Sequence, residues 1–395
     1  MKKTYTYDER LFANIPPYDS PKAYEKSREK FDQGAYRESV LYLIDSFNPS
    51  IRLEYDDDLK KDGQKKNKPS FFGRLFSKSE AKEYGPGKHF TIPHGPLTLH
   101  IDITEEKIEV NVPFLELPDD SRAIPMLRSA CELNLGQLDT LFLTLKGNQL
   151  HFDFSCPLEL AHPRKLRYMF QELCAIGNRF YYEFIENFQA KPIEQMQIIP
   201  CEEKEVQRVI EVIRRTCNEA KTVVQECLNE RKLGAAWHHL LAAFLKLNYV
   251  IQSQGALYYK FRTTLKELSD DDLDIPQTVN AGVRFFDELL AISDEEFAKK
   301  LYQVHIFCSL KGGIDLGDVR SESSQTLEAA LKDFEGDAEE ACLKCFFRLY
   351  SIYFFNDVPD DLDRLIVQTL RSAQDKPFEL AAPILLKGMN EISKR

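Results

Sequence analysis

Residues 97–112 read LTLHIDITEEKIEVNV and carry the clearest structural pattern in the chain. Apolar and polar side chains alternate on both sides of Thr104-Glu105-Glu106. A period of two is typical of β-strands with one buried face. The stretch therefore predicts two antiparallel strands joined by a short turn. A second hairpin is predicted at residues 138–154, because Gly147 and Asn148 tolerate the positive φ of a tight turn.

Helical patterns follow each of these hairpins. Residues 120–133 carry apolar side chains at helical spacing, and Pro163 begins a second such stretch, where its missing N–H costs nothing. The order of strands, helix, hairpin and helix predicts an α+β module over residues 88–190, an antiparallel sheet with two helices.

Three further regions are expected outside this module. Residues 1–55 predict an N-terminal helical hairpin, with a break at Gly34 that resembles the turn of a tetratricopeptide repeat. Residues 56–87 combine many lysines with Gly and Pro, which is typical of a basic flexible linker. Residues 200–395 read as helical throughout and predict a larger all-helical C-terminal domain.

The helix expected at residues 202–231 has an apolar seam at alternating steps of four and three. This spacing suits either a homodimer interface or a helix packed within its own domain. Small side chains such as Cys217 and Ala220 fill a coiled-coil interface poorly, so the second interpretation is favoured. The seam consists of Val206, Ile210, Ile213, Cys217, Ala220, Val224 and Cys227.

The composition of the chain limits the classes of function that it can have. The 395 residues carry a net charge of −11, which argues against a nucleic-acid partner, because phosphate recognition needs clustered Lys and Arg. No apolar run is long enough to span a membrane, and Lys2-Lys3 are not followed by the apolar segment of a secretory signal. The nine cysteines are expected to be buried reduced thiols. We therefore expect a cytoplasmic protein.

The module at residues 88–190 resembles the YbjN-like and type III secretion chaperone-like superfamily. The resemblance is carried by Ile108-Glu109-Val110-Asn111-Val112-Pro113, the junction Leu133-Asn134-Leu135-Gly136, the hairpin at 138–154 and the helix from Leu166 to Phe188. It implies a protein-binding module whose members bind client segments along the sheet or dimerise, without catalytic chemistry. It covers about a quarter of the chain.

Two sets of residues are candidates for partner binding. The first is the apolar cluster in the basic linker, formed by Phe71, Phe72, Arg74 and Phe76. It could touch an anionic membrane surface peripherally, dock in a partner's groove, or pack back on the module. The second is the polar face of the predicted sheet, formed by Lys107, Glu109 and Asn111.

Several short motifs suggest chemistry but lack its requirements. Cys342 and Cys345 form a CxxC within a helical pattern, without a second ligand pair. Adjacent His238 and His239 point about 100° apart on a helix and cannot readily share one ion. The run that begins at Asp270 lacks the glycine and glutamate of a calcium loop, and Gly312 begins a glycine-rich stretch without the lysine of a phosphate loop. No catalytic, metal or cofactor residue is predicted.

These observations predict a non-enzymatic protein-binding adaptor or chaperone-like protein with one or more protein partners. Two alternatives remain. One is a membrane-peripheral regulatory protein that uses the Phe-rich linker, and the other is an enzyme whose site assembles from residues distant in sequence.

Overall fold

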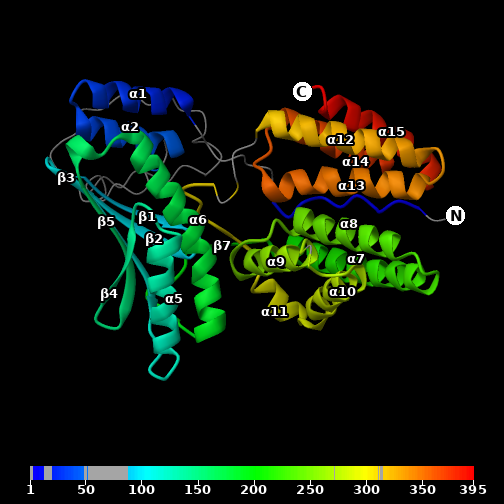
Figure 1. The fold of residues 1–395 in the computed structure, drawn as a ribbon, viewed down its shortest axis with the longest axis horizontal. Helices are drawn as coiled ribbons and strands as arrows, with labels where there is room; N and C mark the ends of the chain where they lie inside the picture. The colour runs from blue at the N-terminus through cyan, green and yellow to red at the C-terminus, as the bar shows by residue number, and fades with distance from the viewer. Residues whose placement is uncertain are drawn as a thin grey trace. The chain divides into compact units, whose positions relative to one another are not determined.

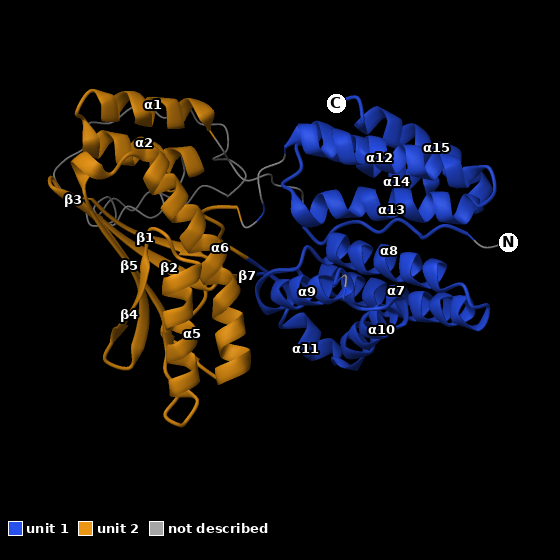
Figure 2. Cartoon of the chain, viewed as in Figure 1, with its two compact units in different colours: residues 1–16, 199–303, 311–395 blue, residues 17–198, 304–310 orange. Residues whose placement is uncertain are grey.

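The computed structural model describes residues 3–12, 20–48, 51, 88–270, 272–309, 311 and 315–395. The chain forms two compact units (Figure 2). An α+β unit comprises residues 17–198 and 304–310, and a helical unit comprises residues 1–16, 199–303 and 311–395. The predicted fold class is confirmed: an antiparallel sheet with helices, a larger helical domain and an N-terminal helical hairpin.

These units divide the chain differently from the predicted boundaries. The helical hairpin belongs to the α+β unit, whereas residues 3–12 belong to the helical unit. The helical unit also lacks residues 304–310, which pack with the sheet instead. Phe71, Phe72, Arg74 and Phe76 lie outside the described residues, as does almost all of the predicted linker.

The main sheet has the strand order β1-β2-β3-β5-β4, and all neighbours are antiparallel (Figure 1). A short strand, β6, pairs with the end of β3, and β7 and β8 form a separate two-stranded sheet. The strands are β1 (Lys88–His94), β2 (Leu97–Ile103), β3 (Lys107–Glu116), β4 (Phe142–Lys146), β5 (Gln149–Pro157), β6 (Lys191–Pro192), β7 (Ile198–Pro200) and β8 (Tyr302–Val304).

Helices cover one face of this sheet. They are α1 (Pro21–Asp32), α2 (Tyr36–Phe47), α5 (Ala123–Gly136) and α6 (Pro163–Phe188), with a 3-10 turn at Leu158–Leu160. α6 packs on β2 and β3, α5 packs on β4, and the α1–α2 hairpin packs on α6. Gly177 allows the close approach of α6 and β2, because an added Cβ would lie 2.6 Å from Leu97 Cδ1.

The helical unit contains nine described helices. They are α7 (Glu203–Asn229), α8 (Leu233–Ile251), α9 (Gly255–Leu268), α10 (Ile275–Ala291), α11 (Asp294–Ala298), α12 (Leu316–Phe334), α13 (Ala338–Phe355), α14 (Asp360–Ala373) and α15 (Phe378–Ile392). None of the helices in the described ranges is both long and apolar enough to cross a membrane.

The same packing order occurs twice in this unit. In the first half, α8 packs on α7 and α10, and α10 packs on α7 and α9. In the second half, α13 packs on α12 and α15, and α15 packs on α12 and α14. The second helix of each half, α8 and α13, joins the two halves. The helical unit is therefore built from two four-helix halves of matching arrangement, with α11 added to the first.

The predicted seam on α7 is buried within the unit, where α7 packs on α8, α10 and α11. The stretches that partly resembled a calcium loop and a phosphate loop contribute N-caps to α10 and α12. Asp274 caps α10 in a capping box with Gln277, and Asp315 accepts hydrogen bonds from the backbone N–H groups of Gly317 and Asp318 at the start of α12. A short carboxylate before a helix satisfies backbone donors that have no intrahelical partner.

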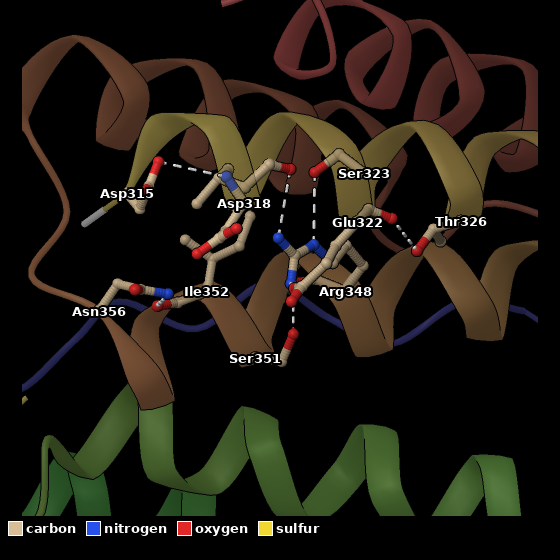
Figure 3. A network of polar contacts seen from close by, with 10 residues as sticks. Asp315, Asp318, Glu322, Ser323, Thr326, Arg348, Ser351, Ile352 and Asn356 are labelled. Carbon is tan, nitrogen blue, oxygen red and sulfur yellow. Dashed lines mark hydrogen bonds and ion pairs between the residues drawn. The ribbon is translucent and has the colours of Figure 1, made fainter. Parts of the chain in front are cut away.

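Arg348 joins α12 and α13 inside the second half (Figure 3). Its guanidinium donates to Ser323 Oγ at 3.3 Å and to the Val319 carbonyl at 3.2 Å, and it pairs with Glu322. Burial lowers the pKa of Arg348, although Glu322 opposes this effect. These contacts of Arg348 thus hold α12 and α13 together.

The N-terminal segment, residues 3–12, is not helical and runs between α8 and α13 (Figure 1). The Tyr5 hydroxyl lies 2.8 Å from His239 Nδ1 on α8, and the Tyr5 ring contacts Phe346 on α13. Leu11 N–H donates to the Val250 carbonyl at 2.7 Å. The segment therefore forms part of the core of the helical unit.

Candidate functional site

The alternation read in the sequence gives the main sheet two chemically different faces. One face is apolar and buried beneath the helices. The opposite face carries the cross-strand row Thr91, His100, Asn111, Asp153 and Phe142, whose members pair in register from β1 to β4. We call this second surface the open face, because the side chains of this row are half-buried or exposed, although Pro93 and Thr98 at one end of the face are buried.

A neighbouring row consists of His89, Asp102, Glu109 and Ser155. The predicted residues Lys107, Glu109 and Asn111 therefore all lie on the open face. Lys107 Nζ and Glu109 Oε1 form an ion pair at 2.8 Å, and both side chains are nearly half exposed. The sequence predicted this polar face, but all three predicted residues lie on β3. The members of the face that lie on the other strands were not predicted.

Asp153 is the centre of a hydrogen-bond network on the open face. Its carboxylate accepts from Asn111 Nδ2 at 2.6 Å, from Lys146 Nζ at 2.8 Å and from the Thr144 hydroxyl. Partial burial would raise the pKa of Asp153, but the hydrogen bonds from Lys146, Thr144 and Asn111 outweigh it and lower the pKa. Asp153 is therefore a fixed anion at neutral pH that ties β3, β4 and β5 together.

Three histidines also lie on this face. His89 pairs with Asp102, and His100 Nε2 lies 3.0 Å from Glu194 Oε1. Burial and the charge of Lys146 lower the pKa of His151, so its ring is neutral at pH 7. The described residues contain no group of three His, Cys, Asp or Glu side chains placed to hold a metal ion.

The free edge of the sheet at β4 is protected by one side chain. Among the described strands β4 pairs only with β5, so its other edge has no strand partner. Asn134 of α5 donates from Nδ2 to the Leu143 carbonyl at 2.9 Å and accepts from Leu143 N–H at 2.8 Å. Its amide thus satisfies the N–H and the carbonyl of Leu143, two of the backbone groups that an added strand would use.

Phe142 is the most exposed aromatic side chain on this sheet, at 58 % of its full accessibility. The sequence prediction missed it, although the signal was present. Phe142 lies between Leu141 and Leu143, which are both buried, so a period of two places it on the opposite face.

A cleft with a volume of about 580 Å³ lies in the helical unit, beside the N-terminal segment. Two of the arginines that line it have carboxylate partners: Arg10 donates to both carboxylate oxygens of Asp363 at 2.7 and 3.0 Å, and Arg371 donates to Glu9 at 2.6 Å. These ion pairs connect the N-terminal segment to α14.

Comparisons with protein-family models, with curated proteins and with solved structures found no match to this chain. The resemblance of residues 88–190 to the YbjN-like and secretion chaperone-like superfamily therefore stays a prediction.

Proposed function

We propose that this protein is a non-enzymatic adaptor that binds a segment of another protein on the open face. One observation carries the proposal: one face of the sheet is apolar and buried, while the polar rows of the open face are half-buried or exposed. The resemblance to secretion chaperone-like modules implies the same kind of activity. We therefore describe the adaptor as chaperone-like.

The chemistry of the open face suits a polypeptide. It presents hydroxyl, amide, imidazole and carboxylate groups in rows at strand spacing, and a peptide presents hydrogen-bonding groups at similar intervals. Phe142 adds an aromatic anchor at one end of a row. Aromatic side chains supply much of the free energy at protein interfaces, and polar neighbours exclude or order water around them.

The Asn134 contacts argue against a partner that extends the sheet at β4. An added strand would have to displace the Asn134 amide, which holds both the N–H and the carbonyl of Leu143. We therefore propose that the partner segment lies across the open face and packs an apolar side chain against Phe142.

A peptide-library selection against the full-length protein tests this function. We expect selected peptides to lose at least ten-fold in affinity, measured by fluorescence anisotropy, when Phe142→Ser or Glu109→Arg is introduced. Phe355→Ser is the matched control, because Phe355 is a similarly exposed phenylalanine, at 54 %, on α13 of the helical unit.

The selection can also overturn the proposal. A library that yields no binder, or peptides that lose the same affinity with Phe355→Ser as with Phe142→Ser, would contradict binding on the open face. Cross-linking of the bound peptide to residues of the helical unit alone would do so as well.

A further inference from the structure

Carboxylates outnumber ammonium groups on the open face. Its two rows and the ionic partners of their members contain the ammonium groups of Lys107 and Lys146. The same set contains the carboxylates of Asp102, Glu109, Asp153 and Glu194. A surface with an excess of one charge favours a partner of the opposite charge. The open face therefore suits a basic segment better than an acidic one.

Two of these carboxylates face each other across neighbouring strands. Asp102 of β2 and Glu109 of β3 are direct partners in the antiparallel register. The Cβ atoms of such partners lie about 5 Å apart, and like charges placed directly opposite each other destabilise a sheet. The pair is thus a local concentration of negative charge, and a cation bound between the two carboxylates would relieve their repulsion.

The chain supplies each of the two carboxylates with one neighbour of its own. His89 of β1 contacts Asp102, and Lys107 Nζ lies 2.8 Å from Glu109 Oε1. These four side chains are between 44 and 52 % exposed, so water and salt screen both contacts. Exposed ion pairs contribute little free energy, and a cation from a partner can join or replace these neighbours.

Asp153 is less available to a partner. Its carboxylate already accepts from Asn111, from Lys146 and from Thr144, and its side chain is 29 % exposed. Glu194 is likewise engaged, by His100 at 3.0 Å. The opposed pair of Asp102 and Glu109 is therefore the part of the open face that best suits an incoming cation.

We propose that the partner segment is basic and that one of its arginines binds between Asp102 and Glu109. The inference rests on the proposed function, because it assigns a charge to the segment that binds the open face. A guanidinium presents five N–H donors in one plane and can donate to two carboxylates at once, whereas an ammonium is a compact point charge. Arginine is therefore favoured over lysine at this position.

The strand register also sets the distance between the bound arginine and Phe142. Phe142 pairs with Asp153 of β5, and Asp153 pairs with Asn111, which is two residues after Glu109 on β3. Strands lie about 4.8 Å apart and rise about 3.4 Å per residue, so the two positions are about 14 Å apart. An extended peptide covers this span in about four residues. The partner segment should thus carry its apolar residue and its arginine about three to five positions apart.

Peptides selected against the full-length protein test this inference. We expect arginine to be enriched about four positions from an apolar residue. In fluorescence anisotropy, Asp102→Asn and Glu109→Gln should each weaken binding about five-fold, because each variant removes one of the two charges. Asp287→Asn is the matched control, since Asp287 is an exposed carboxylate of the helical unit that pairs with Lys221.

Two further measurements separate an effect of charge from damage to the sheet. Citrulline in place of the peptide's arginine keeps its shape without its charge, and it should weaken binding to the parent protein by a similar factor. In the Glu109→Arg protein, a peptide with glutamate in place of the arginine should bind more tightly than the original peptide. A misfolded sheet would not exchange its preference in this way.

The outcomes distinguish this inference from the proposed function. Acidic or neutral peptides that lose affinity with Phe142→Ser, but keep it with Asp102→Asn and Glu109→Gln, would overturn the inference and leave the proposed function intact. Equal binding of the arginine and citrulline peptides would also overturn it. If no peptide binds the open face, both are wrong. If a variant fails to fold, the citrulline comparison on the parent protein decides.

Discussion

At the scale of single residues, the buried side chain of Lys246 constrains the position of the N-terminal segment. Its side chain is 1 % exposed within α8, and its ammonium lies 2.8 Å from Asp8 of the N-terminal segment. Arg215 also pairs with Asp8, at 2.5 Å. Burial lowers the pKa of Lys246, while Asp8 opposes this. An ammonium at this depth requires a counter-ion, so Asp8 fixes the position of the segment.

Asp8→Asn should therefore destabilise the protein strongly. We expect the free energy of unfolding to fall by about 3–5 kcal/mol, because the variant leaves the Lys246 charge buried without its partner. Urea denaturation followed by circular dichroism measures the change. Glu9→Gln is the matched control on the same segment: its ion pair with Arg371 is exposed, so its removal should cost less than about 1 kcal/mol. Equal losses in both variants would contradict the role given to Asp8.

Asp8 also predicts how stability depends on pH. Burial would raise its pKa, but Lys246 and Arg215 outweigh this and hold the pKa below the ordinary 3.8. A carboxylate whose pKa is lowered by folding contributes stability above its unfolded pKa and loses it as the pH falls through the folded value. The stability difference between the parent protein and Asp8→Asn should thus be constant from pH 7 to 5 and shrink below 3.8. Urea midpoints across this range test the trend, and a difference that grows on acidification would refute it.

At the scale of elements, a side chain of α5 protects the edge of β4 that has no strand partner. Asn134 is the only side chain with described hydrogen bonds to both backbone groups of Leu143. Asn134→Ala should lower the free energy of unfolding by about 1–2 kcal/mol, because it leaves these groups unpaired. It should also raise self-association, measured by sedimentation velocity, because the strand edge becomes available. Glu132→Ala, an exposed change on the same helix, should do neither, and a monomeric Asn134→Ala protein would contradict the capping role.

The contact between α8 and α10 depends on a glycine. A methyl group at Gly282 would overlap the Leu240 side chain, so the two helices approach closely only without a Cβ there. Gly282→Ala should cost about 1–3 kcal/mol, since overpacking outweighs the gain in helix propensity. Gly234→Ala in α8 is the control, because nothing lies within 4 Å of its added Cβ, and it should be neutral or stabilising. Thermal unfolding of both variants measures the contrast, and a stable Gly282→Ala protein would show that Leu240 can move aside.

At the scale of the whole molecule, the N-terminal segment joins the two four-helix halves. Tyr7 hydroxyl lies 2.9 Å from the Tyr249 hydroxyl on α8 of the first half, and Arg10 pairs with Asp363 on α14 of the second. Deletion of residues 1–12 should therefore speed hydrogen exchange of amides in α8 and α13 at least ten-fold. Amides of α6 provide the internal reference in the same sample. Unchanged exchange in α8 and α13 would show that the helices hold together without the segment.

The sequence by itself determined the local structure. Period-two alternation predicted β2, β3, β4 and β5 and their buried face, and the apolar seam predicted α7 and its buried side. It also identified Lys107, Glu109 and Asn111 as members of one polar face. These features depend on spacing along the chain, which fixes the side of a strand or helix on which a side chain lies.

Only the tertiary structure decided which distant segments meet. Residues 3–12 pack in the helical unit, and residues 304–309 pack against β1 and α6. The sequence predicted buried cysteines, which fits Cys174 and Cys342 but not Cys131, which is exposed. Contacts of this kind depend on the burial of apolar surface and the pairing of charges between remote segments, and no local pattern in the chain records them.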